Sequence, residues 1–186
     1  MRIIRAADCK VMPWKNGGGT TTEIAVAPEG ASLGDFDWRI SMAHVGADGP
    51  FSSFPGIDRT LSVLTGAGIT LAFGDGDRVR LDRSSAPYPF AADRAVDGLL
   101  VDGPIDDLNV MSRRGRWRHR VERLSGSGSL NASEGLLVLV ARKGEWQVNG
   151  MSLAAGDSAI LDAPGHVELG VSGSEAELYA VWLTAS

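Results

Sequence analysis

Short runs of alternating apolar and polar residues dominate this sequence, and glycine or proline separates most of them. The chain carries 24 glycines and 8 prolines in 186 residues, and they fall between the runs instead of forming one linker. Strict alternation places successive side chains on opposite faces of a strand. Alternating runs occur at residues 20–27, 38–45, 59–64, 69–73, 78–81, 136–141, 145–148, 158–161, 167–171 and 177–183. The pattern predicts an all-β sandwich or barrel with little helix.

Two stretches of the chain share one plan. Residues 61–71, continuing to Leu81-Asp82, are similar to residues 137–150, continuing to Leu161-Asp162. A duplicated β unit of this kind predicts a bicupin-like double jelly roll. The segment GDSAILDAPGH at residues 156–166 resembles the second cupin motif, in which a Gly-Asp turn leads through a strand to a Pro-Gly turn.

Glycine and serine alternate at residues 126–129, which is the best candidate for a hinge or exposed loop. We therefore expect an N-terminal cupin-like half over residues 1–125 and a C-terminal half over residues 126–186. The two halves are expected to pack as one compact unit.

Charge and hydropathy exclude several classes of partner. The formal net charge of −5 opposes attraction to phosphate backbones, so nucleic-acid binding is not expected. No stretch approaches the roughly 18 apolar residues of a membrane span, and the N-terminus lacks a secretory hydrophobic region. We predict a cytoplasmic protein with no membrane partner. Cys9 is the single cysteine and is expected to be a structural thiol.

The densest unusual segment is WKNGGGT at residues 14–20. Three consecutive glycines allow a close backbone approach and can aim amide N–H groups at an anion. The same residues can also form a plain turn into the strand that follows. Both interpretations remain open, and they make the segment a candidate ligand-binding loop: Trp14, Asn16, Gly17, Gly18, Gly19 and Thr20.

Several blocks of residues together resemble the HutD/Ves family. The blocks are residues 14–20, WRIS at 38–41, GPFS at 49–52, FPGIDR at 54–59, DLNVM at 107–111 and Arg113-Arg114. The resemblance spans residues 1–125 in the family's order. It implies a bicupin-like fold and a link to histidine utilisation, in which an intermediate is bound to sense or restrain pathway flux. It names no reaction.

Arginine is the favoured anchor for an acidic metabolite, because its planar fork matches a carboxylate. Arg39 shares a strand face with Ser41, and Arg59 follows Asp58 at the start of a strand, where a barrel mouth is expected. Asp58 and Arg59 should point to opposite faces, which leaves the guanidinium available. Further candidates are Asn16 and Asn109 for reading an amide, Trp14 and Phe51 as an apolar wall, and Met111 and Arg113 from the family blocks.

No cofactor and no transition metal are expected. The three histidines, His44, His119 and His166, never form a His-x-His pair, although a site with Glu23 or Glu168 can be imagined across the fold. No nucleophile motif is present, so no catalytic residue is assigned. In the basic stretch at residues 113–123, alternation predicts that Arg116, Arg118 and Arg120 face solvent while Trp117, His119 and Val121 pack inward.

These observations favour a non-enzymatic protein that binds a small acidic metabolite. The resemblance implies N-formylglutamate, formiminoglutamate or urocanate, each with a carboxylate and a planar nitrogenous group. The alternatives are a cupin-type enzyme acting on a small formamido or imidazole carboxylate, and a regulator that acts through a protein partner. A homodimer is the expected assembly if the chain self-associates.

Overall fold

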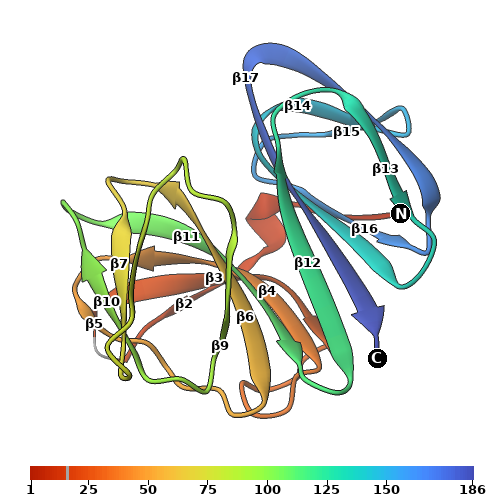
Figure 1. Cartoon of the computed structure of the whole chain (residues 1–186). Helices are drawn as coiled ribbons and strands as arrows, with labels where there is room; N and C mark the ends of the chain where they lie inside the picture. The colour runs from red at the N-terminus through yellow and green to blue at the C-terminus, as the bar shows by residue number, and fades with distance from the viewer. Residues whose placement is uncertain (16) are drawn as a thin grey trace. The chain divides into compact units, whose positions relative to one another are not determined.

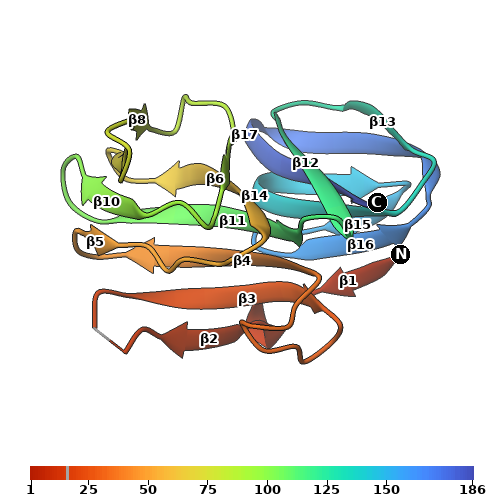
Figure 2. The same ribbon diagram turned by 60° about the horizontal axis from the view of Figure 1, so that its bottom comes forward.

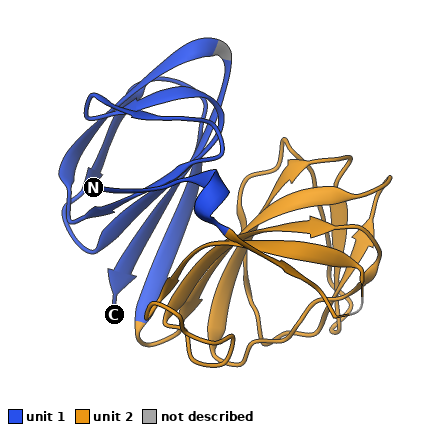
Figure 3. Cartoon of the chain, turned by 180° about the vertical axis from the view of Figure 1, so that it is seen from behind, with its two compact units in different colours: residues 1–9, 117–186 blue, residues 10–116 orange. Residues whose placement is uncertain are grey.

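The computed structural model describes residues 1–15 and 17–186, with the side chain at position 174 left out (Figure 1). The chain forms two compact units (Figure 3). Unit 1 comprises residues 1–9 and 117–186, and unit 2 comprises residues 10–116. Apart from one short 3-10 helix, η1 (Ala6–Asp8), the regular elements of the described residues are strands. The prediction of an all-β fold with little helix is confirmed.

Unit 2 is a sandwich of two antiparallel sheets. The six-stranded sheet has the order β2 (Lys10–Pro13), β3 (Gly19–Ala27), β4 (Trp38–Val45), β11 (Ile105–Arg113), β6 (Ile57–Thr65) and β9 (Tyr88–Ala91). Figure 2 shows β2, β3, β4, β11 and β6 side by side. The four-stranded sheet has the order β5 (Gly49–Pro50), β10 (Val96–Leu100), β7 (Ile69–Phe73) and β8 (Arg78–Leu81).

The core of unit 2 lies between these two sheets. Leu61 and Val63 of β6 and Ile105 of β11 pack in one buried cluster with Ile69 and Leu71 of β7. Because side chains alternate along a strand, odd-numbered residues of β4, β6 and β11 share this face up to a register shift in β6, after which Thr65 pairs with Asp106 on the other face.

Unit 1 is built from one seven-stranded sheet that supplies both faces of its own core. The order is β1 (Arg2–Ile4), β16 (Ser158–Asp162), β14 (Leu136–Val148), β17 (Gly165–Ala185) and β12 (Trp117–Leu124). In addition, β13 (Gly128–Ala132) pairs with β17, and β15 (Met151–Leu153) pairs with β14. The buried cluster includes Leu137, Trp146 and Leu178.

Alternation predicts separate strands where unit 1 has long bent ones. Residues 136–141 and 145–148 are both in β14, and residues 167–171 and 177–183 are both in β17. The register between the two strands shifts between Ala141 and Glu145, and Gly144 lies there with φ +81°. A bulge of this kind bends a strand without ending it, so the interrupted pattern marks a corner of the sheet.

The two units also divide the chain differently from the expected boundary at residues 125 and 126. Strand β12 pairs along its whole length with the end of β17, and β1 pairs with β16. Residues 1–9 and 117–125 therefore belong with the C-terminal strands. The glycine and serine residues at 126–129 lead directly into β13 of the same unit. Strand pairing joins residues distant in sequence, which local composition does not reveal.

The similar stretches of sequence fall one in each unit. Residues 61–82 span β6, β7 and β8 of unit 2, and residues 137–162 span β14, β15 and β16 of unit 1. No helix among the described residues is long and apolar enough to span a membrane.

Candidate functional site

The inner face of the six-stranded sheet in unit 2 carries an unusual group of polar side chains. On β4, β6 and β11, the register places Arg39 and Arg59 on either side of Met111, and Ser41 beside Asn109. These residues occupy the same face as the apolar core. The buried polar cluster, as we call it, consists of Glu23, Arg39, Ser41, Arg59, Asp107 and Asn109. Burial of polar groups is costly unless they are paired, so their contacts matter.

A chain of hydrogen bonds links three members of the cluster. The Arg59 Nε donates to Asn109 Oδ1 at 2.8 Å, and Arg59 Nη2 donates to the same oxygen. Asn109 Nδ2 then donates to Asp107 Oδ1 at 2.5 Å. The Arg59 guanidinium also lies 4.6 Å from the centroid of the Phe51 ring and 5.6 Å from that of Phe90. Aromatic faces and the Asn109 amide together hold this cation in one orientation.

Asp107 is the least satisfied member of the cluster. It has no exposed surface, and its Oδ2 atom has no hydrogen-bond partner among the described residues. Burial raises the pKa of Asp107 to about 6, although the nearby Arg59 charge and the Asn109 bond act in the opposite direction. Burial lowers the pKa of Arg59 to about 10, so the guanidinium remains charged near neutral pH. The site therefore combines a permanent cation with a carboxyl group that titrates near neutrality.

The second arginine of the cluster is paired. Arg39 Nε donates to Glu23 Oε2 at 2.7 Å, and the side chains are 7% and 24% exposed. The register between β3 and β4 shifts between Glu23 and Ala25, which is where this carboxylate reaches the arginine. Glu23 is the more exposed partner, so the cluster is accessible to solvent at Glu23.

Two polar atoms of the cluster differ from the rest in their hydrogen bonding. Arg59 Nη1 takes no part in the hydrogen bonds to Asn109, and Asp107 Oδ2 has no hydrogen-bond partner in the described part of the chain. The first is a charged donor, and the second is an acceptor when the carboxyl is ionised. A small molecule with a carboxylate and an N–H group would match both.

Strand alternation separates the expected residues of the N-terminal loop. Trp14 is half-buried against the core of unit 2, and its Nε1 donates to Thr21 Oγ1 at 2.8 Å. Thr20 pairs with His44 and lies on the opposite face of β3, so Thr21, not Thr20, accompanies Trp14. Asn16 lies outside the described residues.

The glycine run is part of the turn between β2 and β3. Gly17 has φ +71°, and its N–H donates to Trp14 O at 3.1 Å. Trp14 N–H donates to Gly19 O at 2.9 Å, and Gly18 O accepts from Gly46 N–H at 2.8 Å. The N–H of Gly17 is therefore used inside the turn. This geometry favours the turn interpretation over an anion-binding nest.

We expect the substitutions Gly17→Ala and Gly19→Ala to differ in their effect on stability. A Cβ on Gly17 meets no atom within 4 Å, so its cost comes from the positive φ alone, about 1 kcal/mol. A Cβ on Gly19 would lie 2.1 Å from His44 O, so the free energy of unfolding should fall further, by about 1–3 kcal/mol. Urea unfolding measures both. If Gly17→Ala abolished binding of a small carboxylate while stability stayed unchanged, the anion-binding nest would be the correct interpretation.

The other expected residues divide into two groups. Arg39, Ser41, Phe51, Arg59 and Asn109 come together around the cluster. Arg59 is 8% exposed, so it lies in the interior of the sandwich and not at a barrel mouth. As expected, it makes no ion pair with Asp58, whose carboxylate contacts Arg114 at 2.8 Å. Asn109 uses its oxygen and one N–H of its amide within the cluster, where it holds Arg59 and Asp107 together.

Met111 and Arg113 have structural contacts. Met111 packs in a buried cluster with Phe36 and Ile57. Arg113 donates from Nε to Phe36 O at 3.0 Å and from Nη2 to Gly34 O at 2.9 Å. Its guanidinium is committed to the chain segment that precedes β4.

Asp107 and Phe90 are site residues that the sequence did not single out as ligand contacts. Asp107 belongs to the block DLNVM, and alternation alone places it on the face of Asn109. That spacing was a usable signal. Phe90 reaches Arg59 only because β9 pairs with β6, which no local pattern indicates.

The three histidines do not converge. His44 Nδ1 lies 2.9 Å from Asp106 Oδ1, and His166 Nδ1 lies 3.4 Å from Asn131 Oδ1. Glu23 is engaged by Arg39. Among the described residues no three histidine, cysteine, aspartate or glutamate side chains form a group suited to a metal ion.

The burial of β12 agrees with its prediction, because Arg116, Arg118 and Arg120 are exposed while Trp117, His119 and Val121 are half-buried. Arg118 pairs with Thr184 and Arg120 with Trp182, and Trp182 belongs to the core cluster of unit 1. The two arginines therefore share a sheet face with Trp182, and both remain exposed there. Trp117, His119 and Val121 lie on the opposite face, with Leu183 and Val181. Alternation gave the exposure of the arginines correctly, and the pairing with β17 adds the contact between Arg120 and Trp182.

Comparison with known proteins agrees with this architecture. The HutD family model matches residues 6–179. The chain is 34% identical to an uncharacterized 21.2 kDa protein in the hutC 3' region of Pseudomonas putida, over 80% of this chain and 77% of the relative. It is 36% identical to Protein Ves of Cronobacter sakazakii, over 76% of this chain and 78% of the relative.

Solved structures give the same result. HutD from Pseudomonas fluorescens SBW25, in a formate condition, superposes with a TM-score of 0.88 at 30% identity, covering 100% of this chain and 98% of the other. A cupin 2 conserved barrel domain protein from Leptotrichia buccalis superposes with a TM-score of 0.57 over 88% of each chain, at 11% identity, which shows the fold alone. The bicupin-like fold class is confirmed. On these matches and its architecture, the chain belongs to the HutD family.

Proposed function

We propose that this protein binds a small carboxylate intermediate of histidine and urocanate degradation at the buried polar cluster of unit 2, and thereby modulates the pathway. Family membership and the 34% identical relative in the hutC 3' region support the link to histidine utilisation. The observation that carries the ligand class is the buried Asp107 Oδ2, which has no hydrogen-bond partner among the described residues, in one cluster with the Arg59 guanidinium.

The geometry favours a ligand with two different ends. A carboxylate would accept hydrogen bonds from Arg59 Nη1, and a planar nitrogen group would donate to Asp107 Oδ2. Phe51 and Phe90 already flank the guanidinium, so an apolar wall stands beside the proposed carboxylate position. N-formylglutamate, formiminoglutamate and urocanate each carry a carboxylate and a nitrogen group. A homodimer remains a prediction for this protein.

A panel of ligands tests the proposal by thermal shift. We expect the three nitrogen-bearing carboxylates to raise the melting temperature, because a ligand at a hundredfold excess over its Kd contributes about 2.7 kcal/mol to folding. Glutarate, which keeps two carboxylates but lacks the nitrogen donor, is the matched control and should stabilise less. Absence of stabilisation by all three would remove this ligand class.

One observation favours an enzyme of cupin type as the second candidate. A pKa of about 6 would let Asp107 accept and return a proton near neutral pH. Proton NMR of each stabilising ligand, followed over time with the protein, separates the two functions. An unchanged ligand spectrum supports binding alone, and a new product that the Asp107→Asn variant fails to form supports catalysis.

A further inference from the structure

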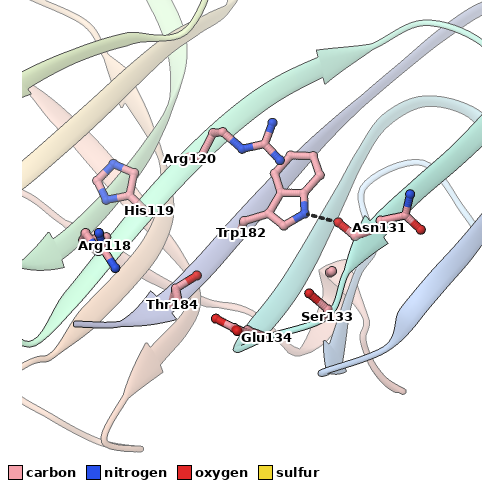
Figure 4. A pocket seen from close by; sticks show the side chains of 9 residues that line it. Arg118, His119, Arg120, Asn131, Ser133, Glu134, Trp182 and Thr184 are labelled. Carbon is pink, nitrogen blue, oxygen red and sulfur yellow. Dashed lines mark hydrogen bonds between the residues drawn. The ribbon is translucent and has the colours of Figure 1, made fainter.

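We propose that unit 1 contains a second ligand site, for a small carboxylate that carries a positively charged nitrogen at its other end. A hollow of about 390 Å³ opens there between β12, β13 and β17 (Figure 4). Its volume is within the range of small-molecule sites. The residues that line this hollow include Arg118, Arg120, Asn131, Glu134, Trp182 and Thr184.

The floor of the hollow is an anchored tryptophan. Trp182 belongs to the core of unit 1 and is 9% exposed. Its Nε1 donates to Asn131 O at 3.1 Å, which joins the end of β17 to β13. The indole ring is therefore held in a fixed position at the bottom of the hollow.

Arg120 is oriented by this ring. Its guanidinium lies 3.7 Å from the ring centroid of Trp182, and Figure 4 shows it above the indole. Its Nη1 also contacts Glu122 on the same strand face. A stacked guanidinium keeps its N–H edge directed sideways, so little conformational entropy is lost when an anion binds that edge.

Arg118 supplies the charge that is not compensated. It lies two residues before Arg120 on the same face of β12 and lines the hollow. Within the described ranges 1–15 and 17–186, its guanidinium makes no ion pair. Two arginines side by side, one without a counter-ion, form a carboxylate site.

The opposite wall has the complementary charge. Glu134 follows β13, lines the same hollow and is exposed. In the part of the chain that the structure describes, its carboxylate also has no ion-pair partner. Arginines on one side and a glutamate on the other select a molecule that is anionic at one end and cationic at the other.

An arginine against an aromatic ring occurs in both units, with the arginine buried in unit 2 and exposed in unit 1. Arg59 lies 4.6 Å from the Phe51 ring in unit 2, and Arg120 lies 3.7 Å from the Trp182 ring in unit 1. The proposed site in unit 1 shares no residue with the buried polar cluster. A failure of either proposal therefore leaves the other one untouched.

The test uses 5-aminopentanoate as the probe, with pentanoate and pentylamine as its two halves. The readout is the indole N–H signal of Trp182 in a proton–nitrogen correlation spectrum, assigned with Trp182→Phe. We expect a saturable shift of this signal. 5-Aminopentanoate should bind most tightly, pentanoate less tightly and pentylamine most weakly. Arg118→Gln should weaken 5-aminopentanoate at least tenfold, since a charge-assisted bond is lost. Glu134→Gln should reduce the affinity for 5-aminopentanoate to that for pentanoate, because the partner of the ammonium group is lost.

Two control variants test whether the effect is specific to this site. Arg80→Gln removes an exposed arginine of β8 in unit 2 and should leave the titration unchanged. Arg59→Lys should also leave it unchanged, which separates this site from the cluster. The proposal is overturned if the Trp182 signal does not shift, if Arg118→Gln binds as tightly as the parent protein, or if pentylamine matches 5-aminopentanoate.

Discussion

Arg59→Lys is expected to reduce the affinity for the best carboxylate of the panel by roughly 10- to 100-fold. A charge-assisted hydrogen bond to a carboxylate in a buried site contributes about 1.5–3 kcal/mol, which corresponds to that loss. Lysine keeps the positive charge but lacks the planar fork that serves Asn109 and the ligand together. The ammonium group would also lose the ring contact that Phe51 provides at 4.6 Å.

Arg59→Ala should lose at least as much affinity, and it should also lower stability. Removal of the side chain leaves Asn109 Oδ1 without its donors in a buried position. For this reason the lysine variant is the cleaner measurement of binding. Titration calorimetry gives the affinity, and circular dichroism establishes that both variants are folded.

Arg78→Ala is the matched control, because Arg78 is exposed on β8 of the same unit. Its affinity should equal that of the parent protein. If both Arg59 variants bind unchanged, Arg59 is not the anchor, and the carboxylate must be assigned to Arg39.

Asp107→Asn is expected to change how stability depends on pH. The pKa of Asp107 is about 6 in the folded protein, above its value in the unfolded chain, because burial penalises the charged form. The folded state therefore binds this proton more tightly than the unfolded state. The stabilisation is complete below the unfolded pKa and is lost as the pH rises through about 6, a change of about 3 kcal/mol.

The asparagine variant has no such proton to lose. Relative to the parent, its free energy of unfolding should therefore rise by about 2 kcal/mol between roughly pH 4.5 and roughly pH 8. Urea unfolding of both proteins at the two pH values measures the difference, and titrations of other groups cancel. Parallel pH profiles would show that Asp107 does not titrate in this range.

The affinity for the ligand should depend on the same ionisation of Asp107, but it should rise with pH where the stability falls. Ionised Asp107 accepts a hydrogen bond from the nitrogen of the proposed ligand, and protonated Asp107 does not. Affinity should therefore rise about tenfold from roughly pH 5 to roughly pH 7 as the carboxyl with pKa about 6 ionises. Asp107→Asn should bind more weakly and without this dependence. An affinity that falls over this range would indicate that the neutral carboxyl donates to the ligand.

Local sequence indicated many of the strands and part of the inner face of unit 2. The alternation of β4 puts Arg39 and Ser41 together, and the same rule separates Asp58 from Arg59. The duplicated stretches correctly indicated two related β units, one in each part of the chain. These features follow from the two-residue period of a strand, which every short segment carries by itself.

Tertiary structure decided which face is inside, which strands meet and which polar atoms remain unsatisfied. β17 places the Trp182 ring beneath the exposed Arg120 of β12, and β9 brings Phe90 to Arg59. Asn109 is committed to Arg59 and Asp107 because β6 and β11 are neighbours. Pairing between distant strands and the resulting burial fix these contacts and the pKa of Asp107, whereas a sequence pattern specifies only the alternation within one strand.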